Sequence, residues 1–238
     1  MMARRAMFDV LVGGVVTLLG GCGLFGGNSY RFKMTVDVET PEGMRTGSSV
    51  YKVLAFKTSE LITGGSSSDS TLTGEALAMD LPGGKTLFAL LRMASGTGAN
   101  DDLAIMSMRA MDPAMVNTEK DKSARRISSE DGIKSPAEVA PKDYPLLVTF
   151  GDIDDPGSVK RVDPANLAAS FGARVRLKRV VVEKTDEDVT TGIRSRFIWW
   201  SEYVNKHLDG SSTVSTDLTA KNIAAGLSLG LFTTESAT

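Results

Sequence analysis

The chain has 238 residues, with 27 Lys and Arg against 29 Asp and Glu, so its formal net charge is −2 at pH 7. Because non-specific nucleic-acid binding requires an excess of cations that neutralise phosphates, this charge balance argues against a nucleic-acid partner. The single Cys and single His argue against the common zinc sites and an internal disulfide, so we expect an ordinary packed core without a metal or cofactor.

Residues 1–21 have the pattern of a secretory signal peptide. Arg4 and Arg5 supply a short positive segment, and residues 10–19 then contain no charge. As a helix this run is about 15 Å long, half of a hydrocarbon core of about 30 Å. It is therefore too short to span a bilayer, and it matches the apolar region of a signal peptide.

The leader ends at Leu19-Gly20-Gly21-Cys22, which resembles the lipobox of bacterial lipoproteins. In that family the cysteine sulfur carries diacylglycerol, the leader is cleaved before the cysteine, and the new amino group is often acylated. The resemblance implies that Cys22 is the lipid attachment site and that Leu19, Gly20 and Gly21 belong to the signal-peptide recognition sequence. The alternative for a lone Cys is burial as a small apolar residue.

The residues after Cys22 imply a location. In the lipoproteins of Gram-negative bacteria that this chain resembles, an Asp directly after the cysteine retains the protein in the inner membrane. Gly23 stands there instead, which implies the outer membrane, on its periplasmic side. We expect residues 22–29 to be a tether, and residues 23–29 reach at most about 25 Å. The folded part is therefore expected to lie close to the membrane.

The first part of the domain predicts an antiparallel hairpin. Residues 30–39 alternate strictly between apolar and polar side chains, which is typical of a half-buried strand. Pro41-Glu42-Gly43 then predicts a turn. Residues 47–57 form the return strand, and its middle is apolar on both faces, which predicts burial on both sides.

The next segments predict a loop and a second hairpin. Residues 59–74 are rich in Gly, Ser and Thr and predict a flexible surface loop. Residues 75–81 and 86–91 are apolar enough to be covered, and Pro82-Gly83-Gly84 provides the turn between them.

Residues 103–111 predict a short strand or one or two helical turns. The methionines of this segment are expected to fill the core rather than to bind metal, because Met packs adaptably; they are Met106, Met108 and Met111. Residues 113–145 are long and charged. A structureless stretch of that length is unusual in a compact domain, so we expect it to be mobile or functional.

The second half of the chain predicts two more strands and two helices. Residues 146–150 form a buried strand that residues 158–162 continue, and residues 174–184 form the last strand. Asp163 is expected to cap a short helix over residues 164–171, which Gly172 ends.

Residues 190–208 predict the longest helix, with Ile193, Phe197, Trp200 and Val204 on one face. The apolar residues 223–232 are expected to dock onto the domain.

These elements predict the fold class α+β for residues 30–238 as a single domain. We expect an antiparallel sheet of about six to seven strands, covered by one longer C-terminal helix and by short helices. Residues 30–50 and 146–193 also look similar to uncharacterised bacterial envelope proteins, which implies only that the two segments belong to one unit.

Two features are candidate binding surfaces. Arg174, Arg176 and Lys178 make residues 174–184 the most basic strand, which is typical of a solvated outer face and would also suit anionic headgroups. Trp199 is expected at the edge of the helix, beside the core residue Trp200. An edge Trp suits a partner or the membrane interface, although core packing is the simpler interpretation.

No catalytic residues are nominated. His207 is expected to be a surface residue at a helix end, because no base and nucleophile can be paired from the sequence. Residues 152–157 begin like a calcium-binding loop, but Pro156 occupies a ligand position and Lys160 stands at the ninth position. A turn rich in Asp is the expected structure there.

The sequence therefore predicts a non-enzymatic envelope lipoprotein that binds a neighbour, either an envelope protein or anionic lipid. One alternative is an envelope hydrolase that acts on cell-wall or lipid material through Asp or Glu residues. A second is a lipid or small-ligand carrier, which requires a cavity beneath the sheet. A deep pocket lined by several acids would favour the hydrolase, and a shallow apolar or basic face would favour the binder.

Overall fold

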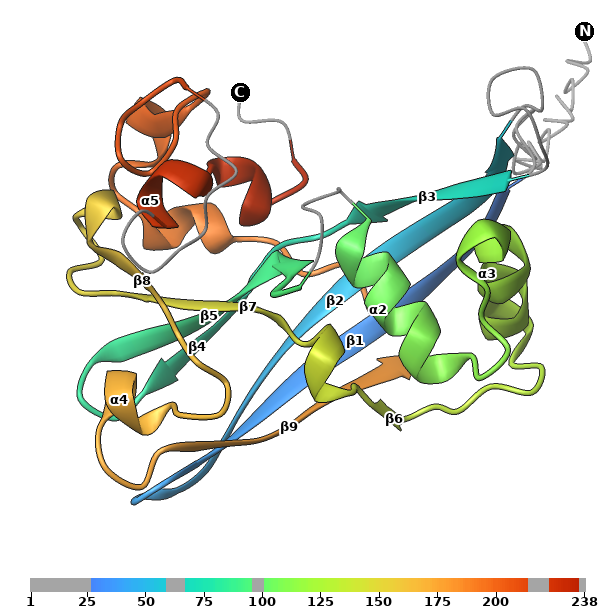
Figure 1. The fold of residues 1–238 in the computed structure, drawn as a ribbon, viewed down its shortest axis with the longest axis horizontal. Coiled ribbons are helices and arrows are strands. Elements are labelled where there is room, and N and C mark those ends of the chain that lie inside the picture. Colours follow the sequence, from blue (N-terminus) through green and yellow to red (C-terminus); the bar gives the residue numbers. More distant parts are fainter. Residues whose placement is uncertain (1–26, 59–66, 96–100, 214–222, 236–238) are drawn as a thin grey trace, which may run out of the picture.

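The computed structural model describes residues 27–58, 67–95, 101–213 and 223–235 (Figure 1). The lipobox and most of the expected tether lie outside the described residues. The fold is α+β, as predicted, but the strands form two antiparallel sheets, one of five strands and one of four, in place of the single sheet expected.

The first sheet is built on the hairpin of β1 (Gly27–Thr40) and β2 (Gly43–Thr58). The predicted alternation of β1 is confirmed, because its apolar side chains all face the core; they are Tyr30, Phe32, Met34, Val36 and Val38. The predicted turn is also confirmed, with Gly43 at a φ of 115°. Two-sided burial of β2 is wrong, since Lys52 is exposed and Leu54 is 40% exposed.

Three further strands extend this sheet to the order β3-β2-β1-β9-β6. They are β3 (Ser67–Thr73), β6 (Ala137–Glu138) and β9 (Arg176–Lys184). The expected strand at residues 174–184 is confirmed. The loop expected over residues 59–74 is wrong for residues 67–73, because Ser68 and Ser70 face the core with hydrogen-bonded hydroxyls. Burying a hydroxyl costs little once it is bonded, so a serine-rich segment can serve as a strand.

The second sheet has the order β4-β5-β7-β8. Its strands are β4 (Leu77–Leu81), β5 (Lys85–Met93), β7 (Pro145–Phe150) and β8 (Val159–Arg161). The predicted hairpin of β4 and β5 is confirmed. The predicted strand at residues 146–150 is also confirmed as β7, whose side chains are all buried.

Two helices cover the core face of the first sheet (Figure 1), namely α2 (Asp102–Met111) and α3 (Lys120–Ser129). The core role of Met106, Met108 and Met111 is confirmed, since all three are fully buried. The expectation of a mobile segment over residues 113–145 is wrong. Ser123, Ala124 and Ile127 give α3 a buried stripe of small and apolar side chains at helical spacing, which its many charged residues obscure in the sequence.

The long helix expected over residues 190–208 is also wrong. Single 3₁₀ turns occupy Ile193–Arg196 and Trp200–Tyr203. They direct Phe197, Trp199 and Trp200 into a second hydrophobic core, separate from the one under the first sheet, which is built on β5 and β7 of the second sheet. Aromatic and β-branched residues are only moderate helix formers, so tertiary packing overrides the helical period here.

The remaining helical elements are short. The predicted helix over residues 164–171 is confirmed only for α4 (Ala168–Phe171), with Asp163 accepting from the backbone N–H of Ala165 and Gly172 ending it at a φ of 101°. The apolar segment 223–232 docks as expected, through α5 (Ile223–Gly226) and the residues after it. Other 3₁₀ turns occur at Asn117–Glu119, Pro141–Asp143, Pro156–Ser158 and Leu229–Leu231.

Candidate functional site

The four lipobox residues lie outside the described residues, but the position of the first strand bears on them. β1 begins at Gly27, only five residues after Cys22 in the sequence and earlier than the expected start at residue 30. The start of β1 lies at the end of the molecule where α3 packs, and the turn between β1 and β2 lies at the opposite end (Figure 1). Any tether through Cys22 therefore leaves the domain beside α3.

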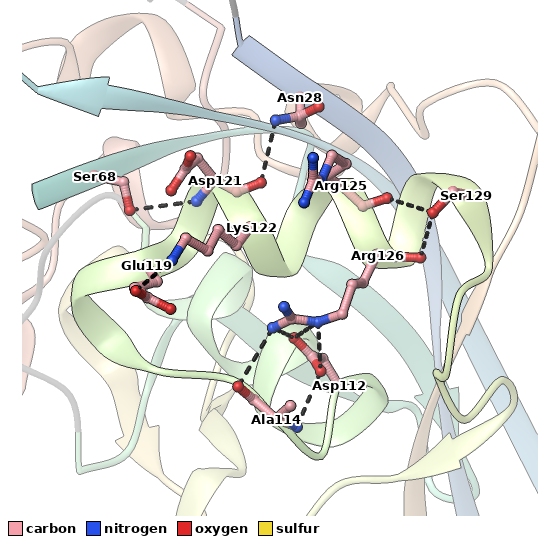
Figure 2. A network of polar contacts seen from close by, with 10 residues as sticks. All are labelled: Asn28, Ser68, Asp112, Ala114, Glu119, Asp121, Lys122, Arg125, Arg126 and Ser129. Atoms are coloured by element: carbon pink, nitrogen blue, oxygen red, sulfur yellow. Dashed lines mark hydrogen bonds and ion pairs between the residues drawn. The ribbon is translucent and has the colours of Figure 1, made fainter.

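Polar contacts hold this end of the domain together, as Figure 2 shows. The side-chain amide of Asn28 on β1 donates to the backbone carbonyl of Asp121 on α3. The backbone N–H of Asp121 donates to the hydroxyl of Ser68 on β3. The starts of β1 and β3 are thus fixed to the first turn of α3, so a pull on the chain before β1 would act on a strand that hydrogen bonds already hold in place.

The deepest charge pair of this region joins α3 to the end of α2. The carboxylate of Asp112 is 1% exposed and accepts two hydrogen bonds of 3.1 Å from Nε of Arg126. It also accepts a bond of 2.5 Å from Nη2 of the same residue and one of 3.0 Å from the backbone N–H of Ala114. Burial alone would raise the pKa of Asp112, but the bonds from Arg126 and Ala114 help hold it below its usual value.

Trp199 is a core residue, which confirms the simpler interpretation of core packing and rules out the alternative of an exposed edge position. It is 6% exposed, and its indole N–H donates to the backbone carbonyl of Ile153 at 2.8 Å. Its ring centroid lies 4.7 Å from that of Phe197. The exposed apolar side chain of this segment is its neighbour Ile198, which is 78% exposed.

The basic residues Arg174, Arg176 and Lys178 are exposed, as a solvated outer face requires. Arg176 pairs with Glu39 at 3.1 Å, near the far end of β1. At about 3.3 Å per residue, the path along β1 from Asn28 to Glu39 is roughly 36 Å long. These three basic residues therefore lie at the opposite end of the sheet from the start of β1, whereas the other end of β9, at Lys184, lies near that start.

The neighbouring pair confirms that this strand surface is used for ion pairing. Arg179 donates to the carboxylate of Asp37 at 2.8 Å, and Thr46 donates to the same carboxylate. Burial acts to raise the pKa of Asp37, but these two hydrogen bonds lower it overall. Arg179 is therefore already paired, whereas Lys178 forms no ion pair with any residue that the structure describes.

The histidine and the Asp-rich turn have structural surroundings. His207 is half-buried and follows a 3₁₀ turn rather than a long helix, with its backbone N–H donating to the carbonyl of Ser211. In the turn over residues 152–157, the carboxylates of Asp152 and Asp155 accept backbone N–H groups two residues ahead, as the sequence predicts for a turn. Within the described ranges, no three or more metal-ligating side chains form a cluster.

Sequence reasoning missed residues 185–190, which cross the outer face of the first sheet. The backbone N–H of Thr185 donates to the carbonyl of Arg31 on β1, and that of Thr190 donates to the carbonyl of Val50 on β2. On the way, Glu187 pairs with Lys33 and Asp188 pairs with Arg31. The sequence did contain a signal for this contact. The acidic run Asp186-Glu187-Asp188 is complementary in charge to the alternating cations Arg31 and Lys33 of β1.

A basic pocket of about 510 Å³ lies between this crossing segment and α3, beside the start of β1. Its cations are Arg31 on β1, Lys52 on β2 and Lys184 at the end of β9, and its one acid is Asp186. The pocket exists because β9 ends opposite Phe32, which leaves residues 27–31 of β1 without a strand on that side. Its polar, positively charged lining suits an anion rather than an apolar ligand.

A second surface hollow is lined by two acids, Glu75 and Glu235, with Phe197 and Trp200 in its wall. Glu75 is 4% exposed, and burial raises its pKa. Its carboxylate accepts the backbone N–H of Ile193 at 2.7 Å, which fixes the start of a 3₁₀ turn. Glu75 therefore stabilises the fold by holding the start of the turn Ile193–Arg196 in place.

The variant Glu75→Gln tests this arrangement through its pH dependence. A raised pKa in the fold means that the stability from protonated Glu75 is present below its ordinary value of 4.5 and is lost as pH rises through the raised value. The free energy of unfolding of the wild type, relative to Glu75→Gln, should therefore fall as pH increases above about 4.5. Urea unfolding over a pH series measures this difference, and a difference that does not vary with pH would contradict it.

The described part of the chain contains no helix that is long and apolar enough to cross a membrane. Comparisons with protein-family models, with curated proteins and with solved structures found nothing that matches this chain.

Proposed function

We propose that the chain is an envelope lipoprotein of binding type, anchored to a membrane by lipid on Cys22. The observation that carries the proposal is the order of features at the start of the chain. An uncharged run over residues 10–19 is followed by Leu19-Gly20-Gly21-Cys22, and the first strand begins at Gly27. Gly23, rather than Asp, supports the outer membrane on its periplasmic side.

The short interval between Cys22 and Gly27 gives the domain an orientation. Five residues reach at most about 18 Å, so the start of β1 and the adjacent α3 face the membrane. The opposite end of the sheet, with Arg174, Arg176 and Lys178, then points into the periplasm. This basic end suits an acidic surface on a neighbouring envelope protein. In this orientation the three basic residues point away from the membrane, so they do not contact its headgroups.

The other two candidate functions have less support. The hydrolase requires a deep pocket lined by several free acids, whereas the hollow at Glu75 and Glu235 is open to the surface, and its buried acid Glu75 is engaged by the backbone of Ile193. The carrier requires a cavity beneath the sheet, whereas the described residues there are packed side chains such as Met106 and Met108. Binding through an exposed face is therefore the better-supported activity.

The substitution Cys22→Ala in the full chain, expressed in a Gram-negative host with labelled palmitate, tests the anchor. Wild-type protein should incorporate the label, lose residues 1–21 and sediment with membranes. The variant should keep its leader and carry no label, because no sulfur is present to accept the lipid. Normal cleavage or labelling of the variant would refute the proposal.

A matched variant separates anchoring from sorting. Gly23→Asp preserves Cys22, so it should be cleaved and labelled like the wild type. By the rule of the lipoproteins that this chain resembles, it should move from the outer to the inner membrane fraction. Unchanged sorting of a labelled Gly23→Asp protein would contradict the proposed location while leaving the anchor intact.

A further inference from the structure

The basic pocket beside the start of β1 contains an unusual pair of like charges. Arg31 on β1 lies directly opposite Lys52 on β2. Because the carbonyl of Arg31 bonds to Thr185 on the other side, Arg31 and Lys52 form a non-hydrogen-bonded pair, whose side chains lie closer together than those of the alternate pairs. Like charges at such positions repel each other and destabilise the sheet unless an anion lies between them.

Two of the three cations of the pocket are already paired, but their partner acids are exposed. Asp188 pairs with Arg31 at 3.2 Å but is fully exposed, and Glu130 pairs with Lys184 while its side chain is 66% exposed. Ion pairs at such exposed positions contribute little, so a stronger anion can displace the carboxylates. Lys52 forms no ion pair with any described residue, although Asp186 also lines the pocket.

The backbone of β1 adds hydrogen-bond donors to these cations. The carbonyl of Arg31 faces away from β2, where it accepts from Thr185, and the N–H of the same residue points in the same direction. By the alternation of an antiparallel strand, the N–H of Ser29 does so too, beyond the end of β9. Backbone N–H groups together with Arg and Lys are the groups that bind phosphate oxygens.

We propose that the pocket formed by Arg31, Lys52, Lys184 and the backbone of Ser29 and Arg31 binds a phosphate ester. The pocket lies beside Ser29, seven residues after Cys22 in the sequence. If Cys22 is acylated, as proposed above, the pocket reaches the membrane surface, and the headgroup phosphate of an anionic phospholipid is the nearest source. A soluble phosphate compound is the other source of the same chemistry, and the experiment separates the two.

The test uses mature, acylated protein in vesicles and follows the modification of individual lysines by an amine-reactive reagent with mass spectrometry. One set of vesicles contains phosphatidylcholine alone, and a second contains phosphatidylcholine and phosphatidylglycerol in equal parts. A third set repeats the first with added inorganic phosphate. Modification of Lys52 should slow about fivefold in the second set if the ligand is a headgroup, or in the third if it is a soluble phosphate.

Two exposed lysines serve as controls in the same protein. Lys57 lies on β2 near the same end of the sheet but outside the pocket, and Lys178 lies at the far end. Both should react at unchanged rates. Equal slowing of Lys52 and Lys57 would overturn the pocket in favour of a diffuse surface effect, and unchanged Lys52 in all three sets would overturn it outright.

Matched substitutions locate the binding energy. Whichever of the two additions slows the modification of Lys52 in the wild type should also slow that of Lys184. Lys52→Gln should reduce this slowing at Lys184 about fivefold, whereas Lys57→Gln should leave it unchanged. Equal protection of Lys184 in the two variants would count against the pocket. Flotation of the vesicles in a density gradient checks the anchor separately. A protein that is not acylated should not float with the vesicles, and that result would refute the anchor. The inorganic phosphate arm can then be run on the protein in solution and still decides whether the pocket binds phosphate.

Discussion

Replacing Arg126 by Met is expected to lower the free energy of unfolding by about 3–5 kcal/mol, because it leaves a buried carboxylate without its cation. The carboxylate of Asp112 is 1% exposed and accepts hydrogen bonds from both Nε and Nη2 of Arg126 (Figure 2). Met preserves much of the side-chain volume, so the loss reports the missing charge and hydrogen bonds. Urea unfolding at neutral pH, followed by circular dichroism, measures it.

The same variant should behave differently in acid. The lowered pKa of Asp112 means that the stability from its ionised form is present above the ordinary value of 3.8 and is lost as pH falls through the lowered value. The difference between wild type and Arg126→Met should therefore shrink below about pH 3.8. A difference that persists undiminished below the lowered pKa would show that lost packing, and not charge, causes the effect.

Arg125 provides a matched control on the same helix. It is exposed, and it forms no ion pair with a described residue. Arg125→Met should change the free energy of unfolding by no more than about 0.5 kcal/mol. Similar losses for Arg125→Met and Arg126→Met would contradict the assignment of α3's two faces.

Replacing Phe197 by Ala is expected to destabilise the domain by about 3–5 kcal/mol, the usual cost of removing a buried aromatic ring. Phe197 is 3% exposed. Its ring centroid lies between 4.7 and 5.9 Å from those of five other aromatic residues; they are Phe88, Phe150, Trp199, Trp200 and Phe232. The cavity left by Ala would open at the centre of this cluster, which joins β5 and β7 to the C-terminal segment.

The adjacent residue is the control for this prediction. Ile198 is 78% exposed, so Ile198→Ala should change the free energy of unfolding by no more than about 0.5 kcal/mol. Thermal unfolding of both variants and of the wild type provides the comparison. A large loss for Ile198→Ala, or a small one for Phe197→Ala, would contradict the 3₁₀ arrangement of this segment and favour a different one.

The basic pocket could not be located from the sequence, because it combines four separate segments. Arg31 and Lys52 become neighbours only through the register of the β1–β2 hairpin, which the sequence could have suggested. Lys184 joins them because β9 ends opposite Phe32, and residues 185–190 then cross the sheet. The end of a strand depends on what its neighbours cover, and no local pattern encodes that.

Sequence alone determined the features whose physical cause is local. The two-residue period over residues 30–39, the Gly43 turn, the apolar run of β7 and the stop at Gly172 all follow from backbone geometry and side-chain alternation. The short length of the uncharged run over residues 10–19 belongs to the same class, because ten residues are too few to cross a bilayer, whereas the lipobox that follows the run stays a prediction.

Only the tertiary structure decided how these elements share two cores. It turned a serine-rich stretch into β3 because Asp101 and Thr118 bond its buried hydroxyls, and it gave α3 a helix because the first sheet has an apolar face to cover. It also replaced a helical period at residues 193–203 with 3₁₀ turns, since burying Phe197, Trp199 and Trp200 together outweighs helix propensity. Burial is a property of the whole chain, and it prevails wherever local preferences are weak.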